Sequence, residues 1–187
     1  MELQDTITQE EMVNKCKRGD SSGYTELYHW HAKEIYNTIY RLVNHTAEAE
    51  DLLQESFVAA FQDIGSFENT GGFRAWIKRI AINKSISWLR KQKNQVWIEF
   101  DAGILITETE ETLDEIAFTT KVSDVINAIE KLPDQYRTIV QLYLLENIPQ
   151  AEIANMVGLT HNTVRVQYHR AKQQILKALE KKERNER

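Results

Sequence analysis

The sequence predicts an all-α fold of two small helical domains joined by an acidic linker, and three observations support this. Apolar residues recur at helical spacing up to about residue 93, and again from residue 122 to 179. Between these stretches the pattern stops, and residues 99–120 carry seven acidic side chains and no basic one. A chain of 187 residues can supply each domain with its own core. We therefore expect domains at residues 1–94 and 122–187, with a linker at 95–121.

Helix start and stop signals divide the two domains further. Asp20 is placed to cap a long amphipathic helix, and Thr46 to cap the next helix, which Gly65 ends. A fourth helix is expected from Phe73 to about residue 93. Beyond the linker, a helix follows the turn at Pro133. Its apolar residues are Ile139, Val140, Leu142, Tyr143 and Leu145.

Charge is distributed very unevenly along the chain. The net charge is −5, but residues 1–72 carry −8 and residues 73–98 carry +7. The following segments carry −7 at 99–120, −2 at 121–159 and +5 at 160–187. Two cationic segments separated by an acidic one indicate two separate contacts with a polyanion such as nucleic acid.

The stretch from Pro149 to Lys172 predicts a helix-turn-helix. Pro149 suits the first turn of a helix, Gly158 breaks the helical pattern, and Thr160 can cap a second helix rich in Arg, His and Lys. Four apolar residues of the second helix are spaced to face inward: Val164, Tyr168, Ala171 and Ile175. The opposite side offers groups that suit base edges and phosphates, namely Asn162, Arg165, His169 and Lys172. The alternative is a solvated basic face on an ordinary helical hairpin.

The helix at residues 73–91 contains no acidic residue and forms a second cationic site. Phe73, Trp76 and Ile77 are spaced to pack against the domain. Basic side chains interleaved with aromatic ones suit unpaired bases, because stacking and phosphate charge together bind single strands. In the alternative interpretation, Trp76 and Trp88 are simply core residues.

Several other functional classes receive no support from the sequence. We find no phosphate-binding loop, no nucleophile elbow and no metal-ligand spacing, so no catalytic residue, metal site or cofactor is predicted. His29 and His31 point to different sides of a helix. Cys16 is expected to be a buried small hydrophobic residue. The absence of a membrane-spanning run and of a signal segment predicts a cytoplasmic protein without membrane insertion.

In this order, the segments resemble the extracytoplasmic-function (ECF) group of bacterial RNA polymerase sigma factors. Residues 49–57, AEDLLQESF, look like the segment that docks on the β′ clamp helices of the polymerase. Residues 73–91 look like the segment that opens the promoter and holds the −10 element. Residues 132–137, LPDQYR, and the helix-turn-helix look like the domain that reads the −35 element.

The resemblance implies a sigma region 2 domain at residues 1–94, a sigma region 4 domain at 122–187, and roles for particular residues. The polymerase-binding residues would be Glu50, Asp51, Gln54, Glu55 and Phe57. The residues for −10 binding and melting would be Trp76, Lys78, Arg79, Asn83, Lys84, Arg90 and Lys91. The residues for −35 binding would be Thr160, Asn162, Thr163, Arg165, Val166, His169, Arg170 and Lys172.

The partners implied by the resemblance are core RNA polymerase, through its β′ clamp helices and β flap, promoter DNA, and an anti-sigma factor. The acidic linker would either thread the polymerase channel or act as a solvated spacer. At Ser87, Asn162 and Gln167 the chain departs from the residues usual in the family, so the resemblance implies no particular promoter sequence.

Two other functions compete with that of a sigma factor. A dimeric helix-turn-helix regulator would need a receiver domain of alternating strands and helices, which residues 1–95 do not suggest. An enzyme would need the catalytic motifs that the sequence lacks.

The acids at residues 50–55 also have a purely structural alternative. Negative charges there could simply favour the N-terminal half of their helix.

Overall fold

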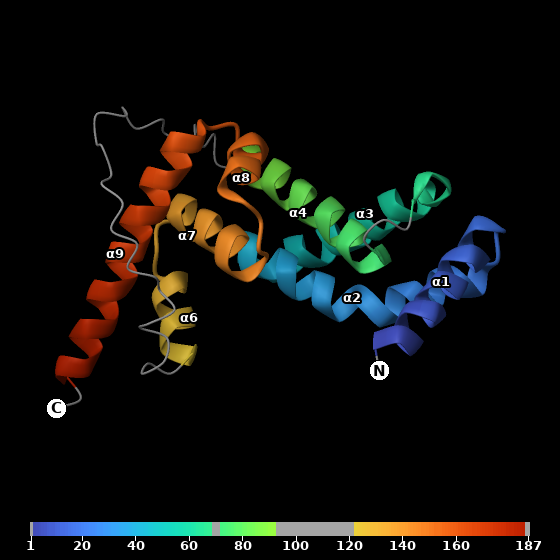
Figure 1. Cartoon of the computed structure of the whole chain (residues 1–187), viewed down its shortest axis with the longest axis horizontal. Coiled ribbons are helices and arrows are strands. Elements are labelled where there is room, and N and C mark those ends of the chain that lie inside the picture. Colours follow the sequence, from blue (N-terminus) through green and yellow to red (C-terminus); the bar gives the residue numbers. More distant parts are fainter. Residues whose placement is uncertain (1, 69–71, 93–121, 186–187) are drawn as a thin grey trace. The chain divides into compact units, whose positions relative to one another are not determined.

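The computed structural model describes residues 2–68, 72–92 and 122–185, and the chain divides into two compact units (Figure 1). The first unit spans Met1–Gln95 and the second Val96–Arg187. In the described ranges every regular element is a helix, which confirms the predicted all-α fold. The predicted linker, residues 95–121, lies outside these ranges.

The first unit consists of helices packed around the long helix α2. Its elements are α1 (Glu2–Lys17), α2 (Ser21–Val43), α3 (Thr46–Gln62), the 3-10 turn η1 (Ile64–Ser66) and α4 (Gly72–Gln92). Helix α2 packs against α1, α3 and α4, and α3 also packs against α4. The described part of this unit contains only helices, so it is not a receiver domain with alternating strands.

The helix boundaries in the first unit follow the predicted caps only in part. Asp20 caps α2 as predicted, since its carboxylate accepts a hydrogen bond from the Ser22 N–H at 2.9 Å. The predicted cap at Thr46 is wrong. His45 has the extended backbone of a cap, and its Nδ1 accepts from the Glu48 N–H at 3.5 Å. The predicted stop at Gly65 is also wrong, because α3 ends at Gln62 and Gly65 lies within η1.

Helices α1 and α2 approach each other closely at Gly23. A Cβ on Gly23 would lie 2.7 Å from the Met12 carbonyl oxygen and 2.9 Å from the Cys16 nitrogen, so only glycine fits. An ion pair between Lys15 and Glu26, at 2.9 Å, spans the same contact. Cys16 is buried as predicted, and burial raises the pKa of its thiol to about 11, which disfavours the reactive thiolate.

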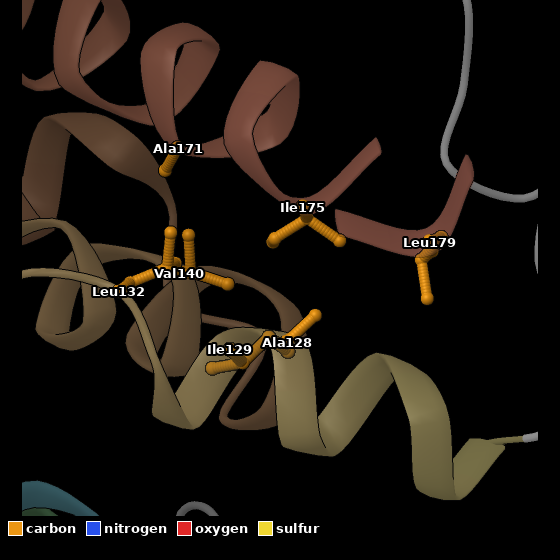
Figure 2. Packing of buried hydrophobic residues seen from close by; sticks show 7 residues of the cluster. All are labelled: Ala128, Ile129, Leu132, Val140, Ala171, Ile175 and Leu179. Carbon is orange, nitrogen blue, oxygen red and sulfur yellow. The ribbon is translucent and has the colours of Figure 1, made fainter. Parts of the chain in front are cut away.

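The described residues of the second unit, 122–185, form four helices and one π turn. They are α6 (Val122–Glu130), α7 (Asp134–Val140), the π turn η2 (Gln141–Leu145), α8 (Gln150–Val157) and α9 (His161–Asn185). Figure 2 shows the part of the core formed by α6, the end of α7 and the inner side of α9. Its buried residues are Ala128, Ile129, Leu132, Val140, Ala171, Ile175 and Leu179.

The helix after Pro133 continues into a π turn that the sequence pattern did not predict. The Glu146 N–H donates to the Gln141 carbonyl five residues earlier, at 3.2 Å, so this turn is wider than an α-turn. An extra residue in a turn shifts the side chains that follow. Ile139 and Leu142 are buried, whereas Tyr143 and Leu145 are exposed.

Candidate nucleic-acid interface

The turn between α8 and α9 has the geometry that the sequence predicts. Gly158 adopts the left-handed conformation, with φ of 73°, and its N–H donates to the Ala154 carbonyl at 2.9 Å. Thr160 Oγ1 accepts a hydrogen bond from the Thr163 N–H at 3.1 Å and so caps α9. These two local contacts fix where α9 begins and therefore which of its side chains face outward.

The outward side of α9 presents an amide, an imidazole and several cations. Thr160 and Asn162 are exposed, and Arg165, His169, Arg170 and Lys172 are partly exposed. His169 Nε2 lies 3.0 Å from Gln173 Nε2, one turn further along the helix. On the opposite side Val164, Ala171 and Ile175 are buried, while Tyr168 packs against the core cluster, as predicted.

Two of the residues predicted to contact DNA do not lie on this surface. Thr163 and Val166 are only 3% and 5% exposed, and the Thr163 hydroxyl is hydrogen-bonded to the Thr160 hydroxyl at 2.7 Å. Helix α9 packs against both α7 and α8, so a larger part of its circumference is buried in the first turns than one row of apolar residues would cover. Gln167 is also buried in this part of α9. We therefore leave Thr163 and Val166 out of the interface.

The outward side of α4 carries part of the predicted cationic set. Arg79, Asn83 and Arg90 follow one another at steps of four and seven residues, which places them on one side of the helix, and all three are exposed. Lys91 is exposed in the last turn. This arrangement can contact phosphates and, through the amide of Asn83, base edges.

The other cations of α4 lie at its edges and turn toward carboxylates of the same unit. The Arg74 guanidinium forms a bidentate salt bridge with the Glu34 carboxylate on α2, with N–O distances of 2.7–2.9 Å. The Lys78 ammonium lies 3.6 Å from the same carboxylate. The hydrogen bonds from Arg74 hold the pKa of Glu34 below its usual range. On the other edge, Lys84 pairs with Glu55 of α3 at 3.2 Å. Lys78 and Lys84 therefore offer less charge to DNA than the sequence suggests.

Trp76 takes part in an aromatic cluster at the start of α4. Its ring centroid lies 5.0 Å from that of Phe67 and 5.8 Å from that of Phe73, and its side chain is half-buried. Phe73 itself is fully buried. The alternative interpretation of Trp76, as a packing residue, is therefore the better supported one for the free chain.

The acidic surface of α3 has one exposed large apolar residue, Val58, and it is not the predicted Phe57. Glu50, Asp51, Gln54 and Glu55 are exposed, and we call this set the α3 acidic face. Phe57 is only 2% exposed and contacts the rings of Tyr28 and Phe61, so it cannot serve as a surface contact. Val58, one turn after Gln54, is 54% exposed among these acids. Because Val58 stands four residues after Gln54, the sequence alone could have placed it on the same side of α3.

The two histidines of α2 differ as predicted. His29 is exposed, whereas His31 is buried against Phe73, with ring centroids 5.6 Å apart. Burial lowers the pKa of His31 to about 4, so its ring is neutral at pH 7. Across the described residues, no cluster of three or more His, Cys, Asp or Glu side chains is arranged to hold a metal ion. None of the helices in that part of the chain is long and apolar enough to span a membrane.

Known families and proteins match most of the chain. The family model described as Sigma-70 region 2 matches residues 27–95, and that described as Sigma-70, region 4 matches residues 123–175. The chain is 30% identical over 178 residues to the ECF RNA polymerase sigma factor SigW of Bacillus subtilis, covering 89% of this chain and 94% of SigW. It is also 30% identical to the RNA polymerase sigma-H factor of Pseudomonas aeruginosa, covering 93% of this chain and 96% of the sigma-H factor.

Solved structures share the fold at lower identity. The sigma factor RpoE of Bartonella quintana, solved with the anti-sigma factor NepR, matches with a TM-score of 0.52 and 18% identity, covering 84% of this chain and 96% of RpoE. CnrH, solved with the cytosolic domain of CnrY, matches with a TM-score of 0.51 and 20% identity, covering 90% and 95%.

Proposed function

Because the chain belongs to the ECF group of the sigma-70 family of RNA polymerase sigma factors, we propose a division of labour between its two units in promoter recognition. The second unit reads duplex DNA at the −35 element with α9. The first unit binds core polymerase with α3 and holds the opened −10 element with α4. The observation that carries this proposal is that each unit presents its own outward basic helix surface, on α9 and on α4.

On α9, the proposed −35 contacts are the outward residues only. Asn162 and Arg165 lie in the first turns of the helix, where a recognition helix approaches base edges. His169, Arg170 and Lys172 follow on the next turns and suit phosphates. Thr160 combines its capping role with exposure at the start of the helix.

On α4, the proposed −10 contacts are Arg79, Asn83, Arg90 and Lys91, which lie on the exposed side and end of the helix. Lys78 and Lys84 act from the edges, where Glu34 and Glu55 compete with DNA phosphates for them. Opening DNA without ATP requires that captured unpaired bases offset the stacking lost in the duplex, a few kcal/mol per extruded base.

The α3 acidic face, together with Val58, is the proposed contact for the β′ clamp helices of the polymerase. An exposed group of carboxylates around one apolar side chain suits a basic, partly apolar partner surface. The β flap is the corresponding proposed partner of the second unit. Family membership further leads us to propose action in the cytoplasm, no catalysis by the chain itself, and regulation by an anti-sigma factor.

Reconstitution with purified core polymerase tests the polymerase contact. Charge reversal of Glu50 and Asp51 to Lys should weaken co-purification with core polymerase at least about tenfold, because two attractive charges become repulsive. The matched control is Glu180→Lys on α9, an exposed acid outside the α3 acidic face. Equal binding by the charge-reversed variant and the control would refute α3 as the contact.

A further inference from the structure

The outer side of α2 carries exposed aromatic and basic side chains that none of the surfaces above uses. Trp30 is 46% exposed and Tyr40 is 40% exposed, and the Tyr36 ring stacks on Tyr40 with centroids 6.0 Å apart. Lys33 and Asn37 are also exposed. Since residues three, four and seven positions apart share one side of a helix, Trp30, Lys33, Asn37 and Tyr40 form one strip, which we call the α2 face.

The α2 face is positively charged within an acidic part of the chain. Residues 1–72 carry a net charge of −8, yet between His29 and Arg41 the only acidic residue is Glu34. That carboxylate is already bound by Arg74 and lies near Lys78. An anion that approaches this part of α2 therefore meets Lys33 and Arg41 without an uncompensated carboxylate beside them.

The combination of side chains favours unpaired nucleotides as the ligand. Aromatic rings on a surface with a cation stack on unpaired bases while the cation binds phosphate, whereas the bases of a duplex are already stacked on one another. Asn37 adds an amide that can both donate and accept hydrogen bonds. Trp30 and Tyr40 are ten residues apart, or about 15 Å along the helix, which matches about four stacked nucleotides.

We propose that the α2 face binds about four unpaired nucleotides of the displaced promoter strand, with Trp30 and Tyr40 stacking on bases and Lys33 binding a phosphate. This inference rests on the proposed function, since it extends the −10 contact of α4. Both surfaces belong to the first unit, in which α2 packs against α4. Trp30 lies one turn before Glu34 and Asn37 one turn after it, and the contact of Glu34 with Arg74 joins α2 to the first turn of α4.

Holoenzyme reconstituted from core polymerase and the full chain provides the test. Two fork-junction promoter DNAs share the same duplex, and only one carries a single-stranded non-template tail. The wild type should dissociate more slowly from the tailed DNA. Combining Trp30→Ala with Tyr40→Ala should remove about tenfold or more of that advantage, since stacking on each aromatic ring contributes substantially. Trp30→Phe should keep most of it.

The role of Lys33, the basic residue of the α2 face, is tested with one variant and one control variant. Lys33→Ala should weaken tailed-DNA binding a few-fold and reduce its salt dependence by about one ion. Lys177→Ala, an exposed lysine on α9, is the control and should change neither quantity.

Three results would overturn the inference, and they can be told apart. An unchanged tail advantage in the double alanine variant would show that the α2 face does not bind the strand. An equal loss of core binding would assign the face to a protein partner instead. If the wild-type chain failed to bind core polymerase, the proposed function would fall as well, and that failure would be visible before any variant is compared.

Discussion

The two basic helices, α4 in the first unit and α9 in the second, differ in what decides which side chains face outward. In α9, the left-handed Gly158 and the Thr160 cap fix the start of the helix, and its outward residues follow from that register. In α4, flanking acids on α2 and α3 turn Lys78 and Lys84 toward the protein. A count of cations along a helix therefore overstates the charge offered to DNA where neighbouring helices carry acids.

The largest expected effect concerns how tightly the first unit is packed. Gly23→Ala should lower the free energy of unfolding by about 3 kcal/mol, because the new Cβ would meet backbone atoms of α1 at 2.7–2.9 Å. Tryptophan fluorescence during urea unfolding reports mainly on this unit, which contains three of the four tryptophans, Trp30, Trp76 and Trp88. Gly65→Ala is the control, since nothing lies within 4 Å of its Cβ position. Equal stability of the two variants would contradict the close α1–α2 contact.

The first unit should also lose stability in acid through His31. The unfolded chain binds a proton on this ring below its ordinary pKa of 6.5, whereas the folded chain does so only near pH 4. The stability contribution is therefore complete above pH 6.5 and falls as the pH drops toward 4, by about 2 to 3 kcal/mol. His31→Leu should flatten this part of the stability curve. An unchanged pH dependence in that variant would show that His31 is not the group responsible.

In the second unit, removal of the α9 cap should have a smaller effect. Thr160→Ala leaves the Thr163 N–H without its acceptor and should destabilise the unit by about 1 kcal/mol. Circular dichroism during thermal unfolding measures this change. Thr160→Asn retains a capping oxygen and should lie close to the wild type. If alanine and asparagine behaved alike, the cap would not determine the register of α9.

The smallest effect is expected for the ion pair at the edge of α4. The Lys84 side chain is 31% exposed and that of Glu55 is 62% exposed, so water screens this pair, and a double-mutant cycle with alanine at each position should give a coupling free energy below about 0.5 kcal/mol. A pair this weak redirects Lys84 without preventing it from binding DNA. A coupling of several kcal/mol would mean that Lys84 is unavailable and should be removed from the −10 surface.

The sequence was sufficient to predict the helical fold, the helix-turn-helix and the inward face of α9, because these follow from periodicity and local turn chemistry. It misplaced Phe57, Thr163 and Val166, whose burial depends on helices distant in the sequence. The π turn at Gln141–Leu145 was also not predicted from the sequence. The ion pairs of Lys78 and Lys84 could not be predicted either, since their acids lie on α2 and α3.

A stepwise promoter assay with two pairs of alanine substitutions tests the division of labour most directly. Arg165→Ala with His169→Ala should weaken closed-complex binding to the duplex about tenfold or more, while core binding and the opening rate of bound complexes stay unchanged. Arg79→Ala with Arg90→Ala should instead slow opening and leave closed-complex binding nearly intact. If both pairs impaired the two steps equally, the two units would not divide promoter recognition as proposed.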